Sequence, residues 1–150
     1  KKMKLIEFIH ENSIYVDVDV DSKKNLFKKI SNIYSQNNPE SSSIIVEKLN
    51  ERERLGTTGV GNGVAIPHSK ISLVEKTKVI FLKLKSPIDF SASDNIDVDM
   101  IFVILAPKNC QSEHLLILSS ISSFLQNKVL VERLRKLKTT SEIYKCFSNI

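Results

Sequence analysis

The stretch Val98–Pro107 reads V-D-M-I-F-V-I-L-A-P, and it decides the fold class of this chain. Every side chain from Met100 to Ala106 is apolar, and the run has the length of a strand, far short of the roughly 20 residues of a membrane span. A strand that is apolar at consecutive positions is typical of a sheet with both faces covered. We therefore predict a central β-strand over Val98–Leu105, with Pro107 just past its end.

Segments of strand and helix character flank this central strand. Val79–Leu84 is short, β-branched and apolar, with Pro87 just past it, and Ile14–Val20 alternates apolar residues with aspartates, so both are predicted strands. Interleaved strands and helices predict an α/β domain whose sheet is covered by helices. The predicted helices run from Ser22 to Tyr34, from about Pro39 to Arg54, and over Ser112–Leu125, Val129–Leu137 and Ser141–Phe147.

Helical spacing also predicts which side chains face the core. The second helix is expected to turn Ile44, Ile45 and Leu49 inward. The helix over residues 112–125 is expected to bury a stripe made of Leu115, Leu116, Leu118, Ile121, Phe124 and Leu125.

Length and composition predict one domain that spans residues 1–150. No segment has the pattern of a signal peptide or a membrane span, so we expect a cytoplasmic protein without membrane insertion. Cys110 and Cys146 match no metal spacing and are expected to be reduced thiols, which suits the cytoplasm. The net charge of +5 raises the question of nucleic-acid binding. However, the lysines are scattered and no basic segment is interleaved with aromatic residues, so no nucleic-acid partner is expected.

All four glycines of the chain lie between Gly56 and Gly63. Glycine allows positive φ and close backbone approach, so we predict irregular structure there, with Pro67 stiffening the chain just before His68. The G-x-G-x-x-G and G-K-[ST] spacings of dinucleotide and phosphate loops are missing. The aspartates between positions 17 and 21 alternate with valines as in a strand, and no paired-histidine motif is present, so no metal or other cofactor is expected.

Three histidines are candidates for a functional role. A histidine titrates near pH 6.5, so it can act as a neutral nucleophile in a cell. His68 follows the glycine segment, His114 lies in the first turn of a predicted helix, where free N–H groups favour an anion, and His10 is expected at the surface. Phosphoryl transfer needs a nucleophile, which His68 can supply, and positive donors, which Arg52, Arg54, His114 and backbone N–H groups can supply. These residues alone leave the alternatives open, because a lone histidine is often structural and Arg52 sits in an E-R-E-R run typical of a solvated helix end.

The segment Glu51–His68, E-R-E-R-L-G-T-T-G-V-G-N-G-V-A-I-P-H, resembles the active-site signature of one protein family. The family comprises the fructose/mannitol/nitrogen-type (type-2) enzyme IIA domains of the bacterial phosphoenolpyruvate-dependent phosphotransferase system. The form T-G-V-G-N-G-V-A-I-P-H is most similar to the nitrogen-regulatory branch, and the resemblance runs from about Tyr15 to Ile143. The chain departs from the pattern at Ser69, where many nitrogen-type members carry glycine. It also has two leucines after His114, where some members have a second histidine.

The resemblance implies a fold, a chemistry and partners. The fold would be a mixed β-sheet flanked by helices on both faces, as in mannitol-type enzyme IIA. His68 would be phosphorylated on Nε2, with Arg52 and His114 as flanking residues that we expect at the rim of the pocket. The donor would be the phosphohistidine of HPr or of its nitrogen-type counterpart, and no cofactor would be needed. The protein would thus be a phosphotransferase component whose downstream partners are a IIB domain or regulated proteins.

Within this family we expect a nitrogen-type regulatory protein, because no IIB or IIC segment is attached in this sequence. One alternative is a fructose/mannitol-type sugar-transport IIA that passes the phosphoryl group to a IIB domain. The other is an interaction module that keeps the fold but has lost phosphotransfer. The presence of His68, Arg52 and His114 argues against the interaction module.

Overall fold

The structure is a computed structural model that describes residues 4–36, 42–109 and 111–148. All five predicted helices are present, and the predicted break at Asn37–Pro39 lies outside the described residues. Ser22 caps the first α-helix as predicted, because its Oγ accepts a hydrogen bond from the backbone N–H of Asn25 at 3.1 Å. In chain order the elements, with η for a 3₁₀-helix, are η1 (Leu5–Glu7), η2 (Glu11–Ser13), β1 (Ile14–Val18), α1 (Lys23–Ser35), α2 (Ser42–Arg54), β2 (Gly59–Gly61), β3 (Val64–Ala65), β4 (His68–Lys70), β5 (Lys78–Ile88), β6 (Val98–Ala106), α3 (Gln111–Gln126), α4 (Lys128–Lys136) and α5 (Thr140–Ser148).

The strands form one mixed sheet with β6 at its centre. Their order is β1-β5-β6-β3-β2, and β4 pairs with β6 as well. β6 runs antiparallel to β5 and parallel to β3 and β4, while β1 is parallel to β5 and β2 is antiparallel to β3. Every side chain of β6 from Met100 to Ala106 is fully buried, which confirms the predicted central strand.

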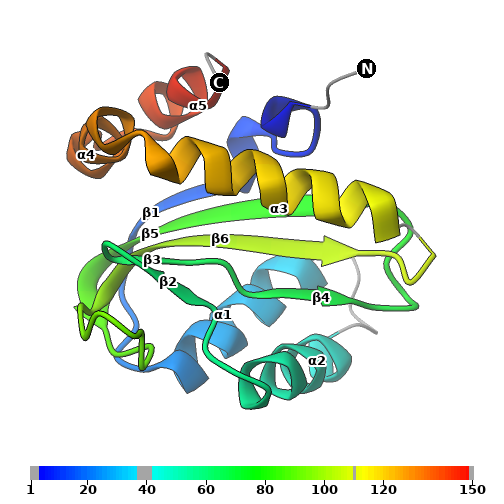
Figure 1. The fold of residues 1–150 in the computed structure, drawn as a ribbon. Coiled ribbons are helices and arrows are strands. Elements are labelled where there is room, and N and C mark those ends of the chain that lie inside the picture. The colour runs from blue at the N-terminus through cyan, green and yellow to red at the C-terminus, as the bar shows by residue number, and fades with distance from the viewer. Residues whose placement is uncertain (1–3, 37–41, 110, 149–150) are drawn as a thin grey trace.

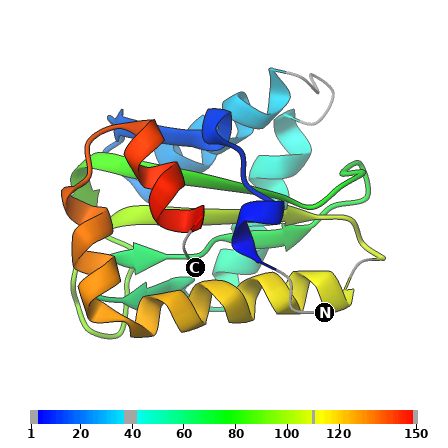
Figure 2. The same cartoon turned by 90° about the horizontal axis from the view of Figure 1, so that it is seen from above.

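Helices cover both faces of this sheet (Figure 1). On one face α1 and α2 pack against Ile101, Val103 and Leu105 of β6. On the other face η1, α3, α4 and α5 pack against Met100, Phe102 and Ile104, and Figure 2 shows these elements lying across the sheet. Because successive side chains of a strand point to opposite faces, the apolar run of β6 supplies both cores. The expected mixed sheet with helices on both faces is confirmed.

The buried face of α3 differs from the predicted stripe. His114, Ile117, Ile121 and Phe124 are buried, whereas Leu115 and Leu116 are 57% and 47% exposed. The observed spacing of three or four residues is that of one helix face. Ile121 and Phe124 are buried as predicted, and Leu118 and Leu125 are partly buried against the same core. The prediction was wrong for Leu115 and Leu116 because it collected apolar residues and left out His114 and Ile117, which lie on the buried face.

The glycine segment contains regular structure, contrary to prediction. β2 and β3 form a short antiparallel hairpin around Asn62 and Gly63, whose φ angles are +55° and +78°. An Asn-Gly pair with positive φ at both residues is the preferred two-residue hairpin turn. A Cβ at Gly63 would also lie 2.7 Å from Nη2 of Arg135, so a larger residue there would displace this guanidinium.

Two strand boundaries also differ from those predicted. β5 continues to Ile88, so that Pro87 lies inside the strand, in the stretch where the pairing with β6 is irregular. A proline lacks the N–H of a regular ladder and is tolerated at such an irregularity. β1 ends at Val18, after a shift in register at Asp17, whose φ is +52°.

Within the described residues, no single helix has both the length and the apolar character needed to cross a membrane. α3 and α4 taken together meet those requirements, but their axes are bent by 90° at the break between them.

Candidate functional site

His68, Arg52 and His114 come from three elements that meet at the start of β4. His68 opens β4 and pairs with Ile104 of β6. α2 packs against β4, and its last turn places Nε of Arg52 3.3 Å from Nε2 of His68. The first turn of α3 places the ring of His114 with its centroid 5.3 Å from that of His68. Figure 1 shows β4 between α2 and α3, so the fold brings together the three side chains that the sequence singled out.

Backbone and side-chain bonds fix each of these elements. The carbonyl of Pro67 accepts a hydrogen bond from the N–H of Ile104 at 3.0 Å, which anchors the chain just before His68. Nη1 of Arg52 donates to the carbonyl of Gly56 at 2.8 Å, which closes the end of α2. The start of α3 is held by Glu113, which accepts a hydrogen bond from the hydroxyl of Thr77. The site is therefore built on anchored elements rather than on a free loop.

The contacts of His68 define which ring nitrogen carries its proton. Nδ1 lies 2.8 Å from the carbonyl oxygen of Ile66, and a carbonyl can only accept, so Nδ1 carries the hydrogen. Nε–H of Arg52 points at Nε2, and an arginine remains protonated in proteins, so Nε2 must offer its lone pair. Both contacts select the same neutral tautomer. Nε2 is therefore the ring nitrogen that carries the lone pair.

The environment also keeps His68 neutral. Burial lowers the pKa of His68 below its ordinary value of 6.5, and the charges of Arg52 and Lys70 act in the same direction. The hydrogen bond to Ile66 and the charge of Glu53 oppose them. A neutral imidazole with a free lone pair is the form that attacks an electrophile.

His114 is buried, not at the rim as predicted. Its side chain is 5% exposed, and its Nδ1 has no hydrogen-bond partner within the described part of the chain. Burial, with smaller contributions from His68 and Lys70, lowers the pKa of His114 to about 4. His114 is therefore a neutral group with unused hydrogen-bonding capacity beside His68.

The buried His114 makes stability depend on pH. The unfolded chain binds a proton at this side chain near the ordinary pKa of 6.5, whereas the folded protein resists it until about pH 4. Above pH 6.5 the neutral His114 does not oppose folding. As the pH drops toward 4, the free energy of unfolding falls by roughly 2–3 kcal/mol, because the unfolded chain takes up the proton first. We expect His114→Gln to remove this part of the pH dependence, measured as the free energy of urea unfolding at several pH values. His10→Gln, a change at an exposed histidine, should keep the wild-type dependence. Equal slopes for wild type and His114→Gln would contradict the assignment.

Three residues of the site were missed by the sequence analysis. Lys70 lies two positions after His68 on β4, so both side chains point to one face of the strand, and its charge lowers the pKa of both histidines. Had a strand been predicted at residues 68–70, the two-residue spacing would have indicated that His68 and Lys70 share a face. Glu53 and Thr58 interact within the site through contacts that no spacing rule indicates.

The remaining predicted features lie elsewhere. His10 is exposed, as expected, just before η2. Cys146 is a buried free thiol on α5, while Cys110 is outside the described residues. Over residues 4–36, 42–109 and 111–148, no three His, Cys, Asp or Glu side chains gather in a way that would hold a metal ion.

Comparisons with known proteins identify the family of this chain. Residues 7–150 match the family described as "Phosphoenolpyruvate-dependent sugar phosphotransferase system, EIIA 2". The chain belongs to this family. This IIA chain is 38% identical, over 130 residues, to a nitrogen regulatory protein of Pseudomonas aeruginosa, with 86% of the chain and 84% of that protein covered. The predicted resemblance to type-2 IIA domains, and to proteins of their nitrogen-regulatory branch, is therefore confirmed.

Solved structures show the same fold. The crystal structure of nitrogen regulatory protein IIA-Ntr from Neisseria meningitidis has a TM-score of 0.90 at 32% identity, covering 95% of this chain and 98% of that one. Enzyme IIA for mannitol from Escherichia coli was solved in complex with phosphorylated enzyme IIB. It has a TM-score of 0.77 at 20% identity, and the match covers 95% of this chain and 100% of that one. As a member of this family, the IIA chain is a component of phosphoryl transfer.

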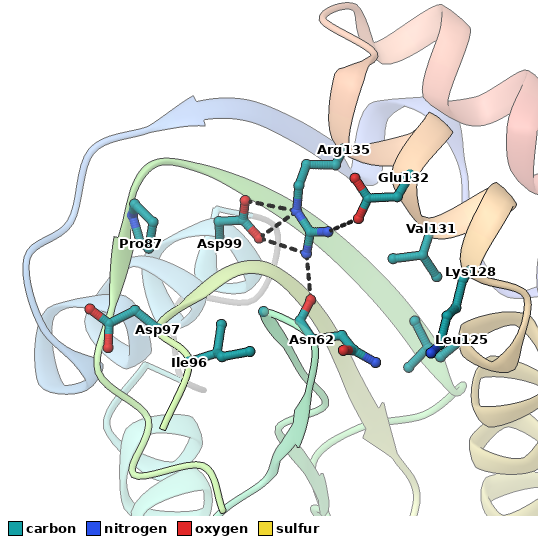
Figure 3. Close-up of a pocket in the computed structure, with 11 residues that line it drawn as sticks. Asn62, Pro87, Ile96, Asp97, Asp99, Leu125, Lys128, Val131, Glu132 and Arg135 are labelled. Atoms are coloured by element: carbon teal, nitrogen blue, oxygen red, sulfur yellow. Dashed lines mark hydrogen bonds and ion pairs between the residues drawn. The ribbon is translucent and has the colours of Figure 1, made fainter. Parts of the chain in front are cut away.

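A separate cavity of about 470 Å³ lies beside the β2–β3 hairpin and α4 (Figure 3). Arg135 of α4 lines it. Its guanidinium donates to Asp99 at 3.1 Å, to Glu132 at 2.8 Å and to the carbonyl of Asn62 in the hairpin turn at 2.6 Å. The hydrogen bonds of Arg135 thus connect α4 to β6 and to the Asn62–Gly63 turn.

Removing this tie should destabilise the fold. We expect Arg135→Met to lower the free energy of unfolding by about 1–3 kcal/mol, because the partly buried Asp99 loses its partner and the Asn62 carbonyl its donor. The matched control is Arg133→Met, which removes the same charge from an exposed position of α4 and should change stability by less than about 0.5 kcal/mol. Urea denaturation of the two variants measures the difference, and equal losses would refute the role of Arg135.

Proposed function

We propose that this chain is a cytoplasmic, nitrogen-type phosphocarrier that accepts a phosphoryl group on Nε2 of His68. The observation that carries the proposal is the fixed tautomer of His68, with its proton on Nδ1 and its lone pair on Nε2. The donor is the phosphohistidine of HPr or of its nitrogen-type counterpart. In the transfer, the N–P bond of the donor breaks and its electron pair returns to the donor ring, while the Nε2–P bond forms and His68 keeps its Nδ1 proton.

The neighbouring side chains suit this step. Arg52 already directs an N–H at Nε2, so a small shift lets its guanidinium donate to the oxygens of the incoming phosphoryl group. His114 has an unpartnered Nδ1 among the described residues, and a phosphoryl oxygen would offer it a bond. Lys70 adds a positive charge close enough to lower the pKa of both rings. Positioning and charge stabilisation are what phosphoryl transfer requires of a protein.

A partner protein has apolar surface to cover near the site. Leu55 lies just past the end of α2 and is 85% exposed, and Leu115 and Leu116 are exposed beside His114. Exposed apolar side chains on the elements that carry a reactive group offer surface for a protein contact. The donor carrier, and after it a IIB domain or a regulated protein, would dock here. The complex solved for the mannitol enzyme of Escherichia coli is a precedent for a IIB partner.

A regulatory role is favoured over sugar transport because the chain is more similar, in sequence and in structure, to a nitrogen regulatory protein than to the mannitol enzyme. The IIA-Ntr structure has 32% identity and a TM-score of 0.90, against 20% and 0.77 for the mannitol enzyme.

Phosphorylation in a reconstituted system tests the proposal. The protein is mixed with phosphoenolpyruvate, enzyme I and either HPr or the nitrogen-type carrier system, and its intact mass is recorded. We expect a gain of one acid-labile phosphoryl group. No gain with either carrier would overturn the proposal and leave the interaction module as the function.

A further inference from the structure

Glu53 is a nearly buried carboxylate one residue after Arg52. Its side chain is only 8% exposed, although carboxylates are rarely buried without partners. Oε2 accepts hydrogen bonds from the backbone N–H of Thr58 at 3.0 Å and from Nζ of Lys23 at 2.9 Å, and Oε1 accepts one from the hydroxyl of Thr58 at 2.6 Å. Three donors on one carboxylate fix the start of the glycine segment against the end of α2.

A continuous series of hydrogen bonds leads from Glu53 to the imidazole of His68. The carbonyl of Thr58, which is itself buried, accepts the N–H of Ile66 at 2.9 Å. The carbonyl of Ile66 then accepts Nδ1–H of His68 at 2.8 Å. The position of the Ile66 peptide therefore depends on Thr58, and the position of Thr58 depends on Glu53.

We propose that Glu53 is a positioning residue for the phosphoryl-accepting histidine. By holding Thr58 it fixes the Ile66 carbonyl, which keeps the proton of His68 on Nδ1 and leaves the lone pair on Nε2. The catalytic meaning of this role rests on the proposed function, whereas the control of the tautomer can be measured without any phosphoryl donor.

The negative charge of Glu53 also acts on the imidazole of His68. The charged groups that influence the pKa of His68 are Arg52 and Lys70, which lower it, and Glu53, which raises it, with the neutral His114 ring alongside. Removing the carboxylate charge should therefore lower the pKa of His68 further. A carboxylate that acted on His68 only through its charge would change the pKa and leave the tautomer unchanged, so the tautomer is the readout that reports positioning.

The decisive comparison is Glu53→Gln against Glu51→Gln. Glu51 lies on the same helix and makes the same charge change, but its side chain is 45% exposed and pairs with Lys48 at the surface. The ¹⁵N chemical shifts of the His68 ring, followed through a pH titration, report the tautomer and the pKa. For Glu53→Gln we expect a rise in the Nε2–H tautomer, a lower pKa and, in the phosphorylation assay, a roughly 10- to 100-fold slower transfer with little change in KM for the carrier. Glu51→Gln should match the wild type in every measurement.

A second, milder variant tests the same contact in case Glu53→Gln does not fold. Thr58→Val is nearly isosteric and removes the hydroxyl donor to Glu53, so it should change the His68 tautomer in the same direction by less. A wild-type tautomer of His68 in both folded variants would overturn the proposal, whatever the pKa. A shifted tautomer in Glu53→Gln, together with a wild-type protein that takes up no phosphoryl group, would support the positioning role and refute the proposed function.

Discussion

Replacing His68 with alanine is expected to abolish phosphoryl uptake completely. In the described part of the site, the imidazole lone pair that faces a cationic donor is that of Nε2 of His68, opposite Arg52. His114 cannot substitute, since it is buried at 5% exposure and has no arginine as close partner among the described residues. Intact mass after incubation with phosphoenolpyruvate, enzyme I and a carrier measures the loss.

The control for this variant is the exposed His10, which lies outside the site. His10→Ala should accept the phosphoryl group at the wild-type rate. His68 is partly exposed, so the variant should keep its fold, which the amide spectrum checks. Residual uptake in a folded His68→Ala protein would mean that the nucleophile is another residue.

Replacing Arg52 with methionine should slow transfer by roughly 100- to 1000-fold, the usual cost of removing one donor aimed at developing charge. Arg52 makes two contacts, with Nε2 of His68 and with the carbonyl of Gly56. The guanidinium also lowers the pKa of His68, so Arg52→Met should raise this pKa. The two effects have separate readouts, stopped-flow or quench kinetics for the rate and a histidine titration for the pKa.

Arg54 provides the matched control. It lies two residues further along α2, is exposed, and has no hydrogen bond or ion pair within the described segments. Arg54→Met makes the same change in charge and should transfer within about twofold of wild type. Equal slowing by the two substitutions would indicate that overall charge, not the contact with His68, carries the effect.

The sequence predicted the parts of the fold that depend on local patterns. The unbroken apolar run of β6 indicates a strand with cover on both faces, because an interior strand has no polar side to show. Boundaries were less predictable where tertiary pairing decides them. Pro87 lies inside β5 because the irregular pairing with β6 tolerates it. The β2–β3 hairpin had a signal in Asn62–Gly63, which the concentration of glycines in that segment obscured.

The site was predictable only in its outline. His68, Arg52 and His114 followed from a family motif, but the exposure of His114 did not, because a histidine on the buried face of α3 looks polar in sequence. Leu115 and Leu116 were assigned to the core because they are apolar, but they lie off the buried face of α3 and are exposed. Glu53 and Thr58 act through backbone hydrogen bonds between segments, which leave no periodic trace.

Identifying the nitrogen that carries the phosphoryl group is the most direct test of the proposal that His68 accepts it on Nε2. The protein, labelled with ¹⁵N and phosphorylated by its carrier, is examined by long-range ¹H–¹⁵N spectra of its three imidazole rings. We predict that the phosphoryl group is on Nε2 of His68, that Nδ1 of the same ring keeps its proton, and that the rings of His10 and His114 are unmodified. A phosphoryl group on Nδ1 of His68, or on either of the other histidines, would contradict it.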